Sequence, residues 1–199
     1  MFAEANAPLL TPISATGRKL GSISITKIQS TMTSDAKIGR NRQKETKTIW
    51  LPGLDPISST KKREKDYSAN EIFNEQIVQQ YLRIMNDEMK KAGYPIETAN
   101  SLFEESNPKN TDFMLGAIIL KCNVRNVVKP IKKDYVQVHF EEIEWQVYNT
   151  QKKEVVLKIK TNGYSQRRGS SVYEPALQAF ERAFRNFLAQ EVTVKAFEK

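Results

Sequence analysis

Residues 135–149, YVQVHFEEIEWQVYN, constrain the fold of this chain more than any other segment. Their apolar residues alternate with polar ones in two sets of opposite parity: Val136, Val138 and Phe140, then Ile143, Trp145 and Val147. Because strand side chains alternate between two faces, one extra residue at Glu141-Glu142 would keep both sets on the core side. The segment therefore predicts a long strand with a β-bulge.

The most apolar run of the chain lies within residues 111–124 and reads FMLGAIIL before Lys121. It is far shorter than the roughly 18 apolar residues of a membrane helix, so we expect a buried strand. A strand that is apolar on both faces belongs at the centre of a sheet. Gly116 within it predicts the close approach of a helix or another backbone.

The other segments supply further strands and two amphipathic helices. In the second helix an aromatic-rich stripe recurs at helical spacing and predicts a core-facing side: Tyr173, Leu177, Phe180, Phe184 and Phe187. Ser68 and Glu71 form a capping-box pattern, and Gly93 gives a stop signal. We expect strands at 21–30 and 154–165, helices at 68–92 and about 172–190, and short strands after 94 and after 190. This order indicates an α+β fold, a mostly antiparallel sheet of about four to five strands with both helices on one face. Residues 1–20 read as an extended tail, and 21–199 as one domain with a long basic loop insertion at 31–66.

The formal charge of +8 is concentrated in that insertion. Nine basic residues lie between Lys37 and Lys65, opposed by Glu45, Asp55 and Glu64. A basic segment attracts nucleic acid, acidic lipid or an acidic protein face, although a charge run also serves simply to keep a loop solvated. Both interpretations remain open at this stage.

The candidate partner-binding residues come from three clusters. Ile49 to Leu54 form an apolar island in the basic segment, and an exposed Trp beside Leu is a typical interface anchor. The island could equally cover the domain's own core. The candidates are Trp50, Leu51, Leu54, Lys61, Lys62, Arg63 and Lys65, with Arg167 and Arg168 in a second basic loop at 166–171.

Residues for catalysis or metal binding are scarce. One cysteine, Cys122, and one histidine, His139, do not make a zinc site, and no motif for nucleotide binding or nucleophilic catalysis is present. Glu141, Glu142 and Glu144 could do acid–base work as a carboxylate cluster, but glutamates on an exposed strand are more often solvated. We therefore expect no enzyme activity, no cofactor and no metal.

The second half of the chain resembles a pattern in bacterial envelope proteins. The pattern consists of DFMLGAIIL, then VHFEEIEWQVYNTQKKEVVLKIKTNGYS, then YEPALQAFERAFRNFLAQ. It is similar to ABC-transport auxiliary lipoproteins and the curli-secretion-channel family, whose small α+β domain is related to the amino-terminal domain of the TolB translocation protein. The resemblance covers residues 20–30 and 68–190, and its detail lies in 111–190. The lipobox cysteine of the lipoproteins is missing, because Cys122 lies far from the N-terminus.

The resemblance implies a non-catalytic component that binds other proteins of an envelope transport or secretion assembly, within a hetero-oligomer. It also implies a place in the periplasm or on the periplasmic face of the outer membrane. The basic segment adds an anionic membrane surface as a further expected partner. Ala5-Asn6-Ala7 has the form of a signal-peptidase site, either as the remnant of a signal peptide or by chance. The alternative is a cytoplasmic nucleic-acid-binding module that uses residues 37–65.

Overall fold

The structure is a computed structural model that describes residues 9–49, 57–97, 111–129, 132–165 and 171–199. Within 41–65 and 126–135 it describes strands but not the surroundings of the side chains. The elements are β1 Ile23–Ser30, β2 Lys37–Ile49, β3 Ile57–Ser68, η2 Ala69–Glu71, α1 Glu75–Lys91, β4 Phe113–Lys129, β5 Lys132–Asn149, β6 Glu154–Tyr164, α2 Tyr173–Leu188 and α3 Glu191–Ala196. The fold is therefore α+β, as expected.

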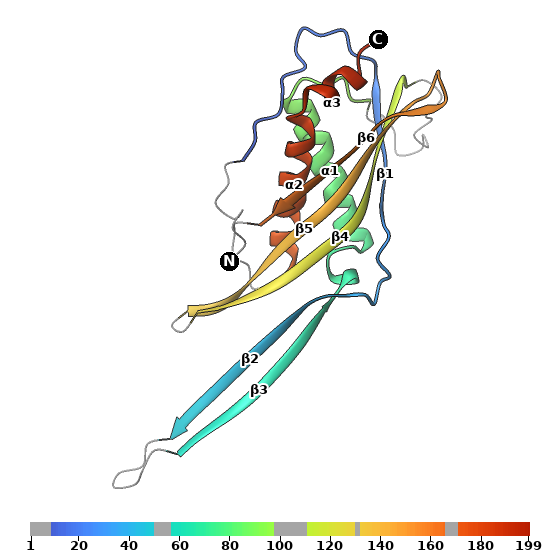
Figure 1. Cartoon of the computed structure of the whole chain (residues 1–199). Coiled ribbons are helices and arrows are strands. Elements are labelled where there is room, and N and C mark those ends of the chain that lie inside the picture. Colours follow the sequence, from blue (N-terminus) through green and yellow to red (C-terminus); the bar gives the residue numbers. More distant parts are fainter. Residues whose placement is uncertain (1–8, 50–56, 98–110, 130–131, 166–170) are drawn as a thin grey trace.

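A six-stranded mixed sheet forms one layer, and the helices lie on one of its faces (Figure 1). The strand order is β3-β2-β4-β5-β6. β1 pairs with residues 113–119 of β4, and β2 pairs with β4 farther along, at Val124 and Arg125. The β2–β3, β4–β5 and β5–β6 pairs are antiparallel, whereas β1 and β2 each run parallel to β4. The sheet is mostly antiparallel because its hairpins account for most of the pairing.

The predicted β-bulge is confirmed in β5. The register of β5 against β6 shifts between Phe140 and Ile143, and the register against β4 shifts in the same region. All six residues of the two apolar sets are buried: Val136, Val138, Phe140, Ile143, Trp145 and Val147. One inserted residue thus keeps β5 apolar on the helix side from Val136 to Val147.

The central position of β4 is also confirmed, since it pairs with β1, β2 and β5. A Cβ on Gly116 would lie 3.3 Å from the carbonyl oxygen of Lys27, so the predicted close neighbour is the backbone of β1. Only alternate residues of β4 are buried, however. Met114, Ile118 and Leu120 are half-buried on the face away from the helices, so that face is covered less than expected.

Aromatic side chains of α2 and β5 fill the core. The Trp145 ring lies 5.6 Å from Phe180, 5.0 Å from Phe184 and 5.4 Å from Phe187 between ring centroids. Its Nε1 donates to Thr161 Oγ1 at 2.7 Å, which satisfies the one polar atom of the indole. The aromatic stripe predicted for this helix is therefore core, apart from its first member, Tyr173, which is exposed.

The first helix begins later than expected. The Ser68 amide donates to Glu71 Oε1 at 3.3 Å, which is one of the contacts of a capping box. This capping box begins the short 3-10 helix η2 and not the long helix. The α1 helix starts at Glu75, after Asn74 accepts a hydrogen bond from the Ile77 amide at 3.1 Å. The predicted stop is correct, because Gly93 adopts φ +84° and donates to the Lys90 carbonyl.

The interpretation of residues 31–66 as a loop is wrong. Residues 37–49 and 57–68 are strands β2 and β3, which pair from Lys37–Ser68 to Ile49–Ile57. Polar and charged residues dominate both strands, so neither face produces the alternation from which a strand is normally predicted. The pairing is decided by backbone hydrogen bonds and by attachment to β4, which the sequence pattern does not reveal.

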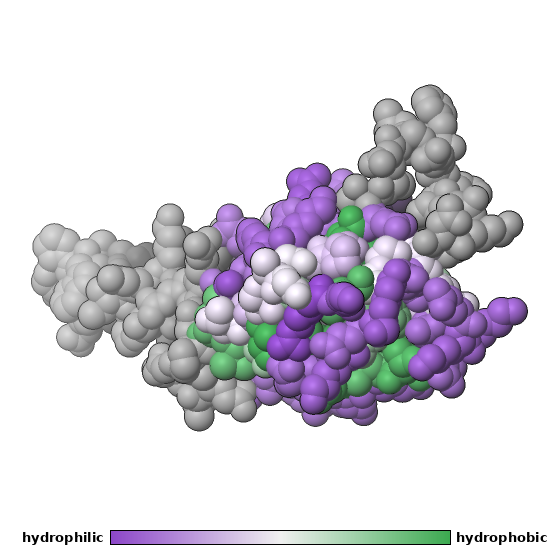
Figure 2. All heavy atoms as spheres, turned by 90° about the horizontal axis from the view of Figure 1, so that it is seen from above, coloured by the Kyte–Doolittle hydropathy of each residue, from purple (hydrophilic) through white to green (hydrophobic). Residues whose placement is uncertain are grey.

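Two shorter predictions also differ from the structure. The segment after 190 forms a third helix, α3, and only Glu198 makes an isolated bridge, to Leu20. After residue 94, Ile96 makes a single bridge with Ile23, and 98–110 lie outside the described residues. Figure 2, viewed from the end where α3 lies, shows a mainly hydrophilic surface with small hydrophobic areas between the polar ones.

Candidate functional site

The strands β2 and β3 form an arm that leaves the rest of the sheet (Figure 1). β2 pairs with β4 only through Gly39–Val124 and Arg40–Arg125, which we call the root of the arm. A Cβ on Gly39 would overlap the carbonyl oxygen of Val124, so this close approach requires glycine. Beyond the root, residues 41–49 extend about 30 Å at the usual strand rise.

Charge is distributed unevenly along the arm. At the root, Asp66 binds Lys37 Nζ at 2.7 Å and Arg40 Nε at 3.0 Å. The hydrogen bonds from Lys37 and Arg40 hold the pKa of Asp66 below its usual value. Farther out, residues 43–47 and 59–63 contain five basic residues and one acidic residue. Most of the net positive charge of the arm therefore lies away from the body of the domain.

A second basic hairpin starts beside the root. It consists of residues 124–129 of β4 and 132–138 of β5, with four basic residues and one acidic residue: Arg125, Lys129, Lys132, Lys133 and Asp134. Sequence reasoning missed this hairpin because its charges are spread among valines. The signal that could have identified it is the valine-rich composition of residues 124–129 and 132–138, because β-branched residues favour strands.

The structure places the predicted site residues only in part. Lys61, Lys62, Arg63 and Lys65 lie on β3, at register positions opposite Glu45, Lys44, Gln43 and Asn41. The island residues Trp50, Leu51 and Leu54 lie outside the described residues, as do Arg167 and Arg168. The structure therefore brings the predicted lysines and Arg63 onto one arm and leaves the other candidates as predictions.

The three glutamates of β5 are each engaged with a neighbour. Glu141 pairs with Lys121, Glu142 with Lys160 Nζ at 2.5 Å, and Glu144 accepts from Gln146. The hydrogen bond from Lys121 lowers the pKa of Glu141, whereas a general acid at neutral pH needs a raised one. This geometry is that of ion pairs on a sheet surface.

The single histidine and the single cysteine lie on neighbouring central strands. The His139 ring meets the Tyr164 ring edge-to-face, with centroids 6.3 Å apart. Cys122 is a buried free thiol, and burial raises its pKa well above the usual value. A buried thiol of this kind is a poor nucleophile. The described part of the chain holds no cluster of three His, Cys, Asp or Glu residues that could bind a metal.

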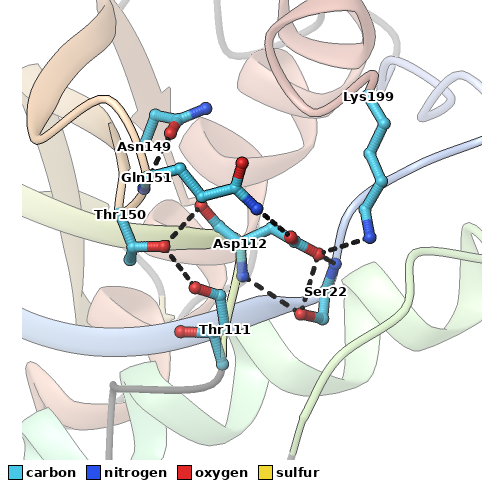
Figure 3. Close-up of polar contacts among 7 residues, drawn as sticks. All are labelled: Ser22, Thr111, Asp112, Asn149, Thr150, Gln151 and Lys199. Atoms are coloured by element: carbon cyan, nitrogen blue, oxygen red, sulfur yellow. Dashed lines mark hydrogen bonds and ion pairs between the residues drawn. The ribbon is translucent and has the colours of Figure 1, made fainter.

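A polar junction at the opposite end of the sheet holds four segments together (Figure 3). Asp112 Oδ2 accepts from the Ser22 amide at 2.8 Å and from Lys199 Nζ at 2.8 Å, and Asp112 Oδ1 accepts from Gln151. The Thr150 hydroxyl donates to the carbonyl oxygens of Thr111 and Asp112. Asp112 thus connects the start of β1, the start of β4, the β5–β6 turn and Lys199. The Asp of the DFMLGAIIL motif therefore has a structural role.

A shallow hollow of about 470 Å³ opens between β5, β6 and the end of α2. The Glu142–Lys160 ion pair lies on its wall, and Asn186 Nδ2 donates to the Asn162 carbonyl at 3.0 Å. Its polar groups are thus largely bonded to one another. No helix within the described ranges is both long and apolar enough to span a membrane.

Comparison with known proteins finds no matching protein family and no matching curated sequence. A Xanthomonas campestris protein of the DUF330 family matches at a TM-score of 0.36 and 12% identity, over 96% of this chain and 92% of that one. A candidate lipoprotein from Caulobacter crescentus CB15 matches at a TM-score of 0.29 and 12% identity, over 59% of this chain and 78% of that one. Similarities this weak carry no conclusion about function.

Proposed function

We propose that this protein is a non-catalytic component of a bacterial cell-envelope assembly for transport or secretion, and that it binds another protein of that assembly through the β2–β3 arm. The observation that carries the proposal is the extension of a polar, basic ribbon beyond the sheet. A two-stranded ribbon has little stability of its own in water. Because the arm extends away from the helices and from the other strands (Figure 1), we expect its role in contacts with another molecule.

The proposed location rests on the sequence resemblance to envelope proteins, which covers β1 and the whole of the body from α1 to α2. The arm falls outside the resemblance, between residues 30 and 68. The body would therefore be the part shared with envelope domains, and the arm the part specific to this protein. This division supports a common scaffold with its own partner-binding element.

Nucleic-acid binding is the second candidate function, because a basic two-stranded ribbon fits a nucleic-acid groove. The two candidates respond differently to salt. Binding that depends on phosphate contacts weakens steeply as salt rises, whereas a protein contact that also uses backbone and apolar groups weakens less.

The test is a capture experiment with the full chain and a nuclease-treated envelope fraction of its host, read by mass spectrometry at low and physiological salt. The arm variant carries Lys61→Glu, Lys62→Glu and Arg63→Glu. The control variant makes the same change in net charge at three exposed lysines of the body: Lys27, Lys152 and Lys158, each to Glu. We expect a defined set of envelope proteins that the arm variant loses and the control retains.

Two results would contradict the proposal. Equal losses with both variants would mean that net charge rather than the arm controls binding. Recovery of nucleic acid alone, in a sample without nuclease and only at low salt, would establish the second candidate function instead.

A further inference from the structure

The arm leaves a stretch of strand edge open on its inner side. β2 is paired with β4 only at the root, yet β2 continues to Ile49 and β4 to Lys129. Beyond the root, residues 41–49 pair with β3 on one side. On the other side they have no neighbour among the strands that the structure describes.

An open edge of this length offers a row of backbone partners. Alternate residues of a strand direct their N–H and C=O groups to the same edge, so residues 41–49 present about four or five such residues. Another extended chain can satisfy these groups by adding to the sheet as a strand. The edge is therefore a docking element whose affinity comes from the backbone and whose selectivity comes from the flanking side chains.

We propose that the open edge of β2 binds an extended acidic segment of a partner protein, which adds to the sheet as a further strand. This inference rests on the proposed function and specifies the chemistry of the partner. The added strand would lie between β2 and the distal half of the β4–β5 hairpin, so two basic hairpins would flank it.

Charge complementarity argues for an acidic partner. β2 and β3 carry nine basic and three acidic residues, a net charge of +6. The hairpin formed by 124–129 and 132–138 adds +3. Together they exceed the formal charge of +8 for the whole chain, so the rest of the chain sums to −1. The field of the molecule is thus strongly one-sided and attracts anionic segments to this end.

The same numbers argue against a second copy of this chain as the occupant. The basic end of another copy would repel the arm, and its remaining residues carry almost no net charge. Charges across a binding interface are usually complementary, and like charges in contact cost affinity. The occupant has to come from a different molecule.

Two other edges of the sheet are weaker candidates. The outer edge of β3 would place an added strand beside one basic hairpin rather than two. β6, the edge at the far side, carries Glu154, Lys158 and Lys160, and Lys160 is already paired with Glu142. The inner edge of β2 is therefore the position where strand pairing and charge act together.

A defined probe tests both parts of the proposal. The probe is a fluorescent synthetic peptide of about 12 alternating Glu and Thr residues, matched in length to a long strand. One analogue has Gln in place of Glu, and another is N-methylated along its central part, which removes the amide donors and keeps the charge. We expect the full chain to bind the acidic peptide and each analogue to bind at least about tenfold more weakly. The N-methylated analogue loses backbone hydrogen bonds that each contribute a factor of a few, and the Gln analogue loses the charge attraction.

Variants of the second hairpin separate this inference from the proposed function. Lys129→Glu, Lys132→Glu and Lys133→Glu leave the β2–β3 arm intact and should still weaken binding of the acidic peptide severalfold. The body control with Lys27, Lys152 and Lys158 changed to Glu has the same net charge and should bind the peptide almost as the unchanged protein does.

Amide hydrogen exchange locates the peptide. We expect slower exchange at residues 41–49 in the complex and unchanged exchange in β6. Equal affinity of the N-methylated and unmodified peptides, or protection of β6 instead of β2, would overturn strand addition. Neither result would contradict the proposed function, which the capture experiment tests separately. Tighter binding of a DNA duplex, or of vesicles of phosphatidylglycerol with phosphatidylethanolamine, than of the peptide would overturn the acidic protein segment as the partner.

Discussion

The body and the arm use the same secondary structure but are stabilised in different ways. In the body, side chains hold the strands: Trp145, Phe180 and Phe184 are fully buried between β5 and α2. In the arm, pairing with the neighbouring strand is the main described contact, and the burial that the structure describes lies at the root, where Ile38 and Tyr67 are buried. The comparison teaches that a strand in this protein can contribute to the core at one end and continue its pairing away from the other strands (Figure 1).

The largest expected effect comes from the aromatic core. Phe180→Ala removes a ring stacked on Tyr81 at 4.2 Å, leaves a cavity under Trp145, and should lower the free energy of unfolding by about 3–5 kcal/mol. Urea denaturation measures it. The arm variant with Lys61, Lys62 and Arg63 changed to Glu is the control and should change this value by less than about 1 kcal/mol. A comparable loss in that variant would mean that the arm belongs to the same cooperative unit as the core.

The second effect concerns the root, where the two regions meet. Gly39→Val forces a side chain into the backbone of Val124 and should cost about 1–3 kcal/mol. Hydrogen exchange should become faster in β2 and β3 and remain slow in β5. Gly116→Ala is the control. Its Cβ would lie 3.3 Å from the Lys27 carbonyl oxygen, which a small shift of β1 can relieve, so this change should perturb exchange less. Faster exchange throughout the body would contradict a separable arm.

A smaller effect is expected at the polar junction of the body. Asp112→Asn weakens the contacts to Lys199 and Ser22 and should cost about 1–2 kcal/mol at neutral pH. The hydrogen bond from Lys199 holds the folded-state pKa of Asp112 below its usual value of 3.8. The stabilisation is therefore fully present above pH 3.8 and is lost as the pH falls through the lowered folded-state pKa. Urea unfolding at several pH values should show the difference between the two proteins shrinking in acid, and a difference that stays constant would contradict this role.

The smallest effect is expected for the equivalent change in the arm. Asp66 also has a pKa lowered by a lysine hydrogen bond, but its ion pairs are exposed to solvent. Asp66→Asn should leave the urea midpoint of unfolding unchanged within error at pH 7, because solvent and salt screen exposed pairs. A loss as large as that of Asp112→Asn would mean that the root of the arm contributes to stability as much as the body does.

Local signals in the sequence account for much of the body. The parity change at Glu141-Glu142 predicted the bulge of β5, because side chains of a half-buried strand must return to the same face. The stop at Gly93 and the aromatic stripe of α2 followed from backbone and helix geometry in the same way. These features were predictable because burial imposes a period on the apolar residues.

The candidate site was predicted less completely. The basic residues Lys61 to Lys65 were identified by composition, but their position on a strand was not. Polar and charged residues dominate β2 and β3, so no period of two marks either strand. The second basic hairpin, from Val124 to Val138, was missed because it continues strands whose apolar halves dominated the pattern.

The sequence by itself determined which face of β5 is buried, where α1 ends and where β5 bulges, since these depend on local geometry and on the alternation of apolar residues. Only the tertiary structure decided that residues 37–49 and 57–68 pair as an arm and that β2 meets β4 at Gly39. Strand pairing joins backbones that are distant in sequence, and backbone hydrogen bonds are the same for every residue type except proline. The arm's position, and with it the proposed binding edge, is therefore a property of the folded sheet.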